Sequence, residues 1–339
     1  MTIHPSRRTA LQLVGAGLIA ACAETRAVGT PNSSTGWRDG PSLPEPVQEI
    51  YPCAHKGMLH QAGGFVAANG SITGPTDAHW TLDPIEGVWR PRASLPSPRH
   101  HPQLVSFAGE LYCLGGFESS SDGMWQMQRS VWRYDEDADS WTLAPQLPAP
   151  NGESTIGVIG DALHVVGGRQ PKANRNLDWS DHTDVGAHFR FDGERWETAA
   201  PLPTPRNSAA GGVIDGKLHI AGGRTVGGGN LPTHELYDPA SDSWQTLAPM
   251  PKAQAGLAAA VVGEKLYAFG GEYFENGGGV FPNGWVYDPA RDEWSALPDM
   301  PKPRHGLGGA ALNGSIYLIG GALKASGNDT SAAVEIYTP

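Results

Sequence analysis

The chain has 339 residues, of which 45 are glycine, 29 are proline and 11 are tryptophan. Glycine and proline interrupt helices and populate turns, so this composition argues against a helical protein and predicts many short strands. Only 17% of the residues are charged, and the formal net charge is -11. Proteins that bind the phosphate backbone carry a dense basic face, so a nucleic-acid partner is excluded.

Residues 1–21 are predicted to be a signal peptide. Arg7 and Arg8 begin a twin-arginine pattern, and the uncharged run over residues 11–21 is too short to span a bilayer. Residues 19–22 resemble the lipobox of bacterial lipoproteins, which implies lipidation of Cys22 and a linker over residues 22–35. We therefore expect an exported, periplasmic or cell-surface lipoprotein. Export by the Sec route, and a plain signal peptide cleaved near residue 21 or 23, are the alternatives.

The remainder of the chain is built from six copies of one motif. In each copy an apolar run ends in a pair of glycines, and a tryptophan stands 26 residues before the first glycine, as Trp37 does before Gly63. Six identical offsets are not expected by chance, so they define internal repeats, each predicted to form four short strands. The tryptophans are Trp37, Trp89, Trp141, Trp196, Trp244 and Trp294, and the glycine pairs begin at Gly63, Gly115, Gly167, Gly222, Gly270 and Gly320.

The motif, with LYAFGG followed by YDPARDEW as a clear copy, resembles the kelch family. The resemblance implies an all-β, six-bladed propeller over residues 36–339, in which each blade is a four-stranded sheet with strands a to d. The last copy ends at VEIYTP without a tryptophan strand, whereas Trp37 has no strand before it. We therefore expect N-terminal and C-terminal strands to share one blade and close the ring.

The direction of the strands predicts which loops share a face. Adjacent strands of a blade are antiparallel, so the loop between strands b and c and the link from strand d to the next strand a emerge together. The b–c loops differ in length between copies, and variable loops on a rigid scaffold commonly carry binding function. The acidic turns between strands c and d, such as DPARD, are predicted to be turn formers only.

Five polar residues stand ten positions after a tryptophan, at the start of the d–a links. The Pro-Arg step of PSPRHH recurs in PTPRN and PKPRH, which predicts a ring of side chains around one pocket. An arginine here is also common in kelch repeats, where it can bond carbonyl groups of the next blade, so a structural role is the alternative. The predicted ligand-binding residues of this ring are Arg99, Asn151, Arg206, Gln254 and Arg304.

A second predicted ring follows the glycine pairs. It places Arg169, Arg224 and Tyr273 in the ligand-binding set, because arginine donors beside aromatic rings suit a polar ligand that has an apolar face and a carboxylate. A general acid or base would come from a carboxylate or imidazole at the same mouth. The four candidates are Glu118, Glu272, His100 and His305.

Other chemistry has little support in the sequence. It contains no P-loop, no HExxH and no GxSxG motif, and it predicts no metal site and no cofactor. Cys53 and Cys113 lie in apolar strand-like segments. In an oxidising compartment they can form a disulfide, and two buried free thiols are the alternative.

These observations predict a propeller that binds a small polar ligand, best an acidic carbohydrate, and contacts a membrane only through its lipid anchor. One alternative is a protein-interaction scaffold, which would expose Trp125, Trp179 and Phe281 at its loop tips. Whether the protein is an enzyme stays open.

If it is an enzyme, the chain resembles the sialic acid epimerases, exported six-bladed kelch proteins, in blade count and export. That resemblance implies chemistry by a glutamate and an arginine on one b–c loop. Glu272 matches the glutamate, but glycines at positions 277–279 stand where the arginine is expected, so Arg224 or Arg304 would have to supply it across the pocket. A copper oxidase similar to galactose oxidase is less favoured, because the sequence lacks the Tyr-His step of that family.

Overall fold

The computed structural model describes residues 35–339, so the predicted signal peptide, the lipidation of Cys22 and nearly all of the predicted linker lie outside the described residues. Within residues 35–339 the chain forms six four-stranded antiparallel sheets, numbered here as blades one to six. From strand a to strand d, blade one is β3 (Cys53–His55), β4 (Met58–Ala62), β7 (His79–Asp83) and β8 (Val88–Arg92), blade two is β9 (Gln103–Phe107), β10 (Glu110–Leu114), β13 (Val131–Asp135) and β14 (Ser140–Ala144), and blade three is β15 (Thr155–Ile159), β16 (Ala162–Val166), β19 (His188–Phe191) and β20 (Trp196–Thr198). Blade four is β21 (Ala210–Ile214), β22 (Lys217–Ala221), β25 (His234–Asp238) and β26 (Ser243–Thr246), and blade five is β27 (Ala258–Val262), β28 (Lys265–Phe269), β31 (Gly284–Asp288) and β32 (Glu293–Leu297). Blade six is β33 (Gly308–Leu312), β34 (Ser315–Ile319), β35 (Val334–Thr338) and β1 (Gly36–Asp39).

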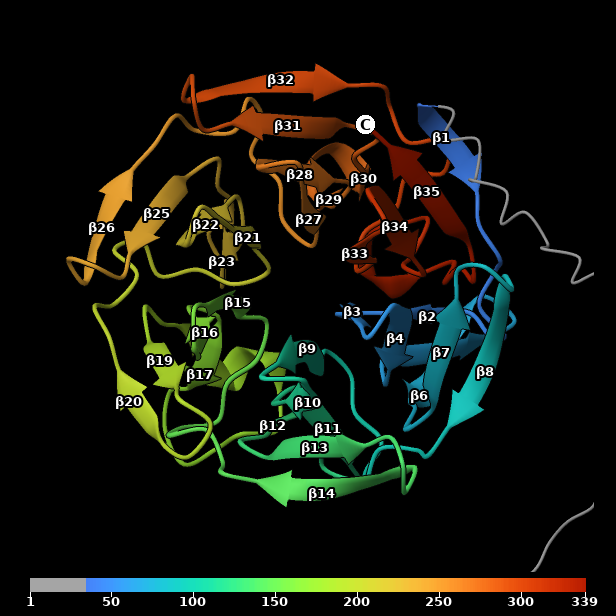
Figure 1. Cartoon of the computed structure of the whole chain (residues 1–339). Helices are drawn as coiled ribbons and strands as arrows, with labels where there is room; N and C mark the ends of the chain where they lie inside the picture. Colours follow the sequence, from blue (N-terminus) through green and yellow to red (C-terminus); the bar gives the residue numbers. More distant parts are fainter. Residues whose placement is uncertain (1–34) are drawn as a thin grey trace, which may run out of the picture. The chain divides into compact units, whose positions relative to one another are not determined.

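The six blades close into a ring (Figure 1). Each innermost strand contacts the innermost strand of the next blade, in the order β3, β9, β15, β21, β27 and β33, and β33 contacts β3 again. Blade six joins the two ends of the described chain, since β1 pairs with β35 and places Trp37 opposite Tyr337. The predicted propeller and the predicted way of closing it are therefore confirmed.

The b–c connections carry short elements of their own. Hairpins form in blades one to five, and the first of them is extended by β2 (Val47–Gln48). Short 3-10 turns lie in three of the loops. The hairpin strands are β5 (Phe65–Ala68) with β6 (Ser71–Pro75), β11 (Phe117–Ser120) with β12 (Gly123–Met127), β17 (Arg169–Pro171) with β18 (His182–Asp184), β23 (Arg224–Thr225) with β24 (Gly229–Asn230) and β29 (Glu272–Tyr273) with β30 (Gly279–Val280), and the turns are η1 (Trp179–Asp181), η2 (Glu275–Gly277) and η3 (Ala325–Gly327).

The repeat tryptophans join neighbouring blades. Each indole packs at an interblade core, and each indole N–H donates to a backbone carbonyl of a preceding d–a link, as Trp244 does to Ala200 at 2.8 Å. The other five tryptophans make the same bond to Pro298, Pro41, Ala93, Pro145 and Ala248. A large apolar ring with one polar group fits this place, because the ring fills the core while its N–H reaches a partner.

Replacing Trp244 by alanine is expected to lower the free energy of unfolding by about 3 kcal/mol, because it opens a cavity between blades three and four. Trp244→Phe keeps most of the apolar contact and removes only the N–H donor, so it should cost about 1 kcal/mol. Chemical denaturation of the two variants measures both effects. Equal stability of Trp244→Ala and the unchanged protein would refute interblade packing at this position.

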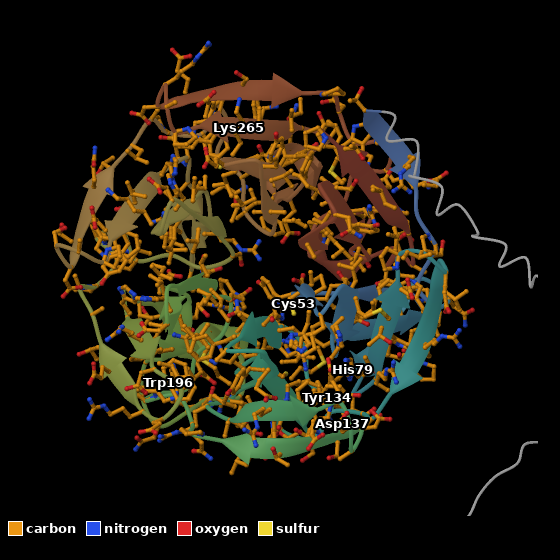
Figure 2. The ribbon with its side chains drawn as sticks, in the orientation of Figure 1. Cys53, His79, Tyr134, Asp137, Trp196 and Lys265 are labelled. Atoms are coloured by element: carbon orange, nitrogen blue, oxygen red, sulfur yellow. The ribbon has the colours of Figure 1, made fainter. Side chains whose placement is uncertain are left out.

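The acidic c–d turns also connect blades. Tyr237 and Tyr287 donate their hydroxyl groups to Asp242 and Asp292 at 2.8 and 2.7 Å. The same Asp242 oxygen accepts the backbone N–H of Ala200, at the end of the preceding blade. The prediction that these carboxylates serve the turns holds, and the structure adds that they tie one blade to the next. The corresponding tyrosine of blade two, Tyr134, also contacts the preceding blade. Its ring lies beside that of His79 in blade one, with centroids 4.9 Å apart (Figure 2).

The glycine pairs lie where a link of the next blade approaches the backbone. Gly222 has a φ of +69°, and a Cβ placed on it would lie 2.7 Å from the carbonyl oxygen of Gln254. A side chain would therefore clash with the link as well as strain the backbone. This close approach is the physical reason for the fixed position of the glycines in each repeat.

The two cysteines of the described chain lie in one core cluster between blades one and two. Cys53 is half-buried and Cys113 is buried, and both are free thiols in this structure. Of the two alternatives left open by the sequence, the structure therefore shows the unpaired thiols. No helix within residues 35–339 is long and apolar enough to cross a membrane.

Candidate functional site

A cavity of about 470 Å³ opens at the end of the propeller axis where the b–c loops and d–a links emerge. All six blades contribute to its lining, so the two kinds of connection share one face as predicted. Its volume falls within the range typical of small-molecule sites, roughly 300–1,000 Å³. Its lining includes four charged residues, here called the polar floor, and five apolar residues, here called the apolar walls, besides uncharged polar residues and glycines. The polar floor is Glu49, Arg224, Glu272 and His305, and the apolar walls are Phe65, Ile72, Trp125, Trp179 and Phe274.

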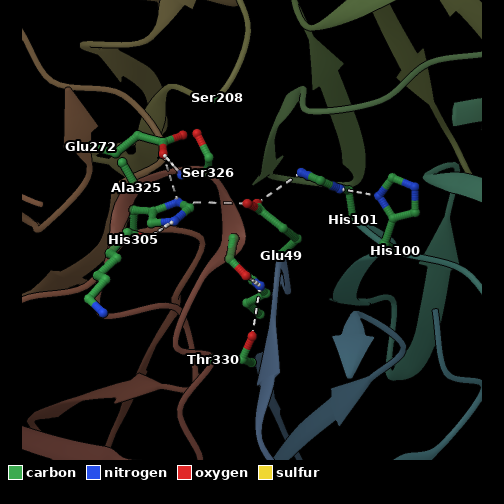
Figure 3. A network of polar contacts seen from close by, with 12 residues as sticks. Glu49, His100, His101, Ser208, Glu272, His305, Ala325, Ser326 and Thr330 are labelled. Atoms are coloured by element: carbon green, nitrogen blue, oxygen red, sulfur yellow. Dashed lines mark hydrogen bonds and ion pairs between the residues drawn. The ribbon is translucent and has the colours of Figure 1, made fainter. Parts of the chain in front are cut away.

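The polar floor is held together by charge-assisted contacts from neighbouring blades. Arg224 donates through Nη1 to Oε1 of Glu272 at 2.6 Å, and the backbone N–H of Ser326 donates to Oε2 of the same carboxylate at 3.0 Å. His305 Nδ1 lies 3.4 Å from Glu272 and 3.7 Å from Glu49 (Figure 3). The other imidazole nitrogen, Nε2, donates to the carbonyl of Lys324 at 3.0 Å. One imidazole therefore stands between two carboxylates at the base of the cavity.

A second layer of charge lies next to this floor. His101 Nε2 contacts Glu49 at 2.9 Å and Glu153 at 3.4 Å, and its Nδ1 lies 2.6 Å from Nδ1 of His100. Glu153 also pairs with Arg169 and lies 4.0 Å from Arg224. Polar contacts thus run without interruption from one side of the axis to the other.

Burial and charge oppose each other in this layer. Burial disfavours the charged form of His101, but Glu49 and Glu153 outweigh it and raise the pKa of His101 to about 9. Burial likewise disfavours the charged form of Glu49, yet His101 and His305 lower its pKa to about 2. For Glu153, Arg169 and His101 overcome burial and hold the pKa well below its usual range. At neutral pH the cluster therefore keeps ionised carboxylates next to a protonated His101.

The sequence analysis missed Glu49, Glu153 and His101. Each stands twelve residues after a repeat tryptophan, one or two positions beyond those considered as candidates. All six residues at this offset have a left-handed backbone, and five of the six neighbouring pairs are joined around the axis by an N–H···O=C bond, such as that from His101 to Glu49 at 2.9 Å. The sequence signal that could have identified these residues is their fixed offset of twelve residues from the repeat tryptophans. The six residues are Glu49, His101, Glu153, Ser208, Gly256 and Gly306.

The predicted ring of five side chains does not face the cavity. Each side chain turns instead to the backbone and donates to the carbonyl of the first glycine of the next pair, for example Arg304 to Gly320 at 2.6 Å and Gln254 to Gly270 at 2.6 Å. Asn151 makes the equivalent bond to Gly167 at 3.1 Å. The structure does not bring these side chains to the cavity: they are buried in hydrogen bonds to the blade that follows each link, which was the alternative left open by the sequence. The five are Arg99, Asn151, Arg206, Gln254 and Arg304.

The three arginines of that ring also neutralise glutamates. Arg99 contacts Glu118 at 2.9 Å, Arg206 contacts Glu235, and Arg304 contacts Glu335 at 2.8 Å. Glu118 was a candidate acid or base, but it does not line the cavity and is held by Arg99. The structure therefore places this carboxylate in the blade framework.

The other candidates divide between cavity and core. Arg224, Glu272 and His305 line the cavity. His100 does not, since its ring stacks on Phe65 at 3.9 Å and its Nε2 donates to the carbonyl of Met124 at 2.7 Å. Burial and the neighbouring His101 hold the pKa of His100 well below its usual value, which keeps this imidazole neutral.

Arg169 and Tyr273 are also outside the lining. The Arg169 guanidinium is buried against aromatic rings, with Cζ 5.1 Å from the Trp125 centroid and 5.3 Å from that of Trp179. Tyr273 packs against Phe281 with ring centroids 5.0 Å apart. Arg169 thus supports the cavity wall from behind, where no ligand contact is expected. No group of three or more metal-ligating side chains is arranged to hold an ion within residues 35–339.

Comparisons with known proteins agree with the fold. The family model described as the KLHDC2/KLHL20/DRC7 Kelch-repeats domain matches residues 153–334, and a Kelch motif model matches residues 98–148. Kelch-like protein terF of Aspergillus terreus is 28% identical over 173 residues, which cover 50% of this chain and 37% of that protein. Kelch-like protein 35 of Mus musculus is 25% identical over 244 residues, which cover 61% of this chain and 40% of that protein.

This chain thus spans well under half the length of these two relatives. A solved structure, titled "Structure of YjhT", superposes with a TM-score of 0.74 at 18% sequence identity, covering 88% of this chain and 97% of that one, and so shares the fold. One of the matching family models spans more than half of the chain. The protein belongs to the kelch-repeat family.

Proposed function

We propose that this protein is an exported kelch propeller that binds a small polar ligand of the carbohydrate class in its axial cavity. The observation that carries the proposal is the polar floor, with Arg224 and Glu272 paired at 2.6 Å beneath aromatic walls. Sugars have hydroxyl groups and apolar ring faces. The charged residues of the polar floor can bond the hydroxyl groups, and the aromatic walls can pack against the ring faces. The twin-arginine and lipobox patterns support the export and lipid anchor of the proposal.

Two of the three side chains that a protein scaffold was expected to expose are not exposed at the loop tips. A scaffold would expose Trp125, Trp179 and Phe281, but Trp125 forms part of the cavity wall and Phe281 packs against Tyr273. Of these three side chains only Trp179 is exposed. A protein partner on the same face remains the outcome that a failed ligand screen would support.

The sequence-based preference for an acidic carbohydrate now rests on Arg224 alone. The charge cluster contains three carboxylates, matched by Arg169, Arg224 and protonated His101. A ligand carboxylate would therefore compete with Glu272 for Arg224, whereas a neutral sugar can bond both groups at once. A panel containing acidic and neutral sugars separates these two classes.

A second candidate function is epimerisation or mutarotation of a sugar. Similarity to the sialic acid epimerases requires an arginine beside the glutamate, and Arg224 reaches Glu272 from the neighbouring blade. In such a reaction Glu272 would take the proton of the anomeric hydroxyl while a second group returns a proton to the ring oxygen, so that the ring opens and closes on the other face. The two carboxylates and the imidazole of the polar floor are the groups available for these transfers.

Binding is tested by thermal unfolding of residues 23–339 with neutral sugars, uronic acids and sialic acids. A ligand present at about 100 times its dissociation constant should add about 2.7 kcal/mol of stability, which is visible as a rise in Tm. Arg224→Met and Glu272→Gln should abolish the rise, while Lys265→Met, on the exposed side of blade five, should leave it intact. A panel without any shift would contradict the proposed function, and exchange of anomers followed by NMR tests the enzymatic candidate.

A further inference from the structure

Exposed apolar side chains gather around the mouth of the cavity. Seven large apolar side chains are exposed in the part of the chain that the structure describes. Three of them, Ile85, Val88 and Leu143, lie in a c–d turn and on outer strands. The other four lie on the b–c loops of four different blades and are called here the apolar rim. They are Met124, Trp179, Phe274 and Leu323, with exposed fractions of 45%, 38%, 55% and 44%.

The apolar rim continues the walls of the cavity. Trp179 and Phe274 belong to both, since they line the cavity and are also exposed. Met124 precedes the wall residue Trp125, and Leu323 lies in the loop of blade six that supplies the lining residues Ser326 and Gly327. Two of the four rim residues therefore line the cavity, and the other two lie on loops that supply lining residues.

The aromatic rings of Phe274 and Trp179, which belong to both the walls and the rim, each contact an arginine. The guanidinium carbon of Arg224 lies 6.0 Å from the Phe274 centroid, and that of Arg169 lies 5.3 Å from the Trp179 centroid. Contacts of this kind stabilise an aromatic ring at a fixed position. Phe274 and Trp179 are thus anchored from below while their outer surfaces face solvent. Scattered apolar residues are ordinary on protein surfaces, but exposed apolar residues on several loops that flank one cavity are typical of a binding site.

We propose that the ligand of this cavity is a glycoside with an apolar aglycone, with the sugar on the polar floor and the aglycone against the apolar rim. The inference rests on the proposed function and adds to it the chemistry of the ligand's outer end. The cavity supports it in two respects. Hydroxyl groups of the sugar match the paired donor and acceptor of Arg224 and Glu272, and an alkyl or aryl group removes the exposed surfaces of Phe274 and Trp179 from water.

The test compares glycosides that differ only in the aglycone. Methyl and n-octyl β-glucopyranosides and β-galactopyranosides are titrated into residues 23–339, below the critical micelle concentration, by isothermal titration calorimetry. We expect an octyl glycoside to bind at least about tenfold more tightly than its methyl counterpart, because the added methylene groups are buried on the rim. Equal affinity of both members of each pair would overturn the proposal while leaving sugar binding intact.

Matched variants locate the effect. Met124→Ser with Leu323→Ser, two rim residues outside the cavity lining, should remove much of the octyl advantage and leave methyl glycoside binding within about twofold. The control pair Val88→Ser with Leu143→Ser changes apolar residues elsewhere that are at least as exposed, at 48% and 58%, and should leave the advantage unchanged. Loss of the advantage in both pairs, or in neither, would contradict binding at the rim.

A sugar-free amphiphile separates this proposal from the proposed function. Octyl tetraethylene glycol should bind at least about tenfold more weakly than the octyl glycoside, and Arg224→Met should reduce octyl glycoside affinity to the same low level. If the sugar-free amphiphile binds as tightly as the octyl glycoside, the rim only attracts alkyl chains and both proposals fail. If none of the probes binds, the proposed function fails together with the inference drawn from it.

Discussion

Replacing Arg304 by alanine is expected to lower the free energy of unfolding by about 3–5 kcal/mol. The Arg304 side chain has no exposed surface, and its partner Glu335 is also buried. Besides the ion pair at 2.8 Å, Arg304 donates to the carbonyls of Gly320 and Ala333 at 2.6 and 2.7 Å. Its removal leaves a buried carboxylate without a counter-charge and two buried carbonyls without these donors, and such groups are costly.

Two variants control for this result. Arg291→Ala removes an exposed arginine from a c–d turn of blade five and should change stability by less than about 0.5 kcal/mol. The double variant Arg304→Met with Glu335→Leu removes both charges and should be more stable than Arg304→Ala. All three are measured by chemical denaturation. If Arg304→Ala folds with unchanged stability but loses sugar binding, Arg304 belongs to a ligand site after all.

Lowering the pH from 6.5 to 4 is expected to destabilise the propeller by several kcal/mol. Blades one, three and four each contain a pair of buried histidines in contact, one on strand b and one on strand c, with ring nitrogens about 3 Å apart. One nitrogen must accept while the other donates, so each contact requires at least one neutral imidazole. The pairs are His60 with His79 at 3.0 Å, His164 with His188 at 2.8 Å and His219 with His234 at 3.1 Å.

The direction of the pH effect follows from the pKa values. Burial lowers the pKa of His164 and His219 to about 4 and that of His60 to about 3, against an ordinary value of 6.5. Between pH 4 and 6.5 the unfolded chain therefore binds more protons than the folded chain, and stability falls as the pH falls. Lowering the pKa of a buried group by about 2 corresponds to about 3 kcal/mol. His101 has the opposite effect, because its pKa is raised to about 9. Its contribution to stability is fully present below pH 6.5 and is lost as the pH rises from 6.5 through about 9.

The protein itself suggests the control for the acid effect. Blade two has Tyr112 and Val131 at the positions of the histidine pair. Copying this arrangement into blade four by His219→Tyr with His234→Val should weaken the dependence of unfolding free energy on pH between 4 and 6.5. Denaturation curves at pH 4, 5 and 6.5 measure that slope. An unchanged slope in the double variant would mean that the pairs do not set the acid sensitivity.

The architecture could be predicted from the sequence because its causes repeat at fixed spacing. The offset from Trp37 to Gly63 recurs in every blade, since each indole must reach a link carbonyl and each glycine must admit the next link. The unfinished last repeat likewise predicted that the strand of Trp37 and the strand of Tyr337 share one blade, and the two strands do pair. Strand direction then placed the b–c loops and d–a links on one face, where the cavity lies.

The composition of the site depended on side-chain directions that residue type does not reveal. Arg304 and Arg224 lie on the same face, yet Arg304 turns to the backbone of its own blade and Arg224 turns to Glu272. Glu49, His101 and Glu153 meet at the axis because a left-handed backbone at each directs the side chain inward. A glutamate or a histidine in the sequence does not predict a left-handed backbone. The sequence alone thus determined the blades, the closure and the face on which the cavity opens. The pairing of charges around the axis was decided by the tertiary structure, because it depends on contacts between side chains of different blades.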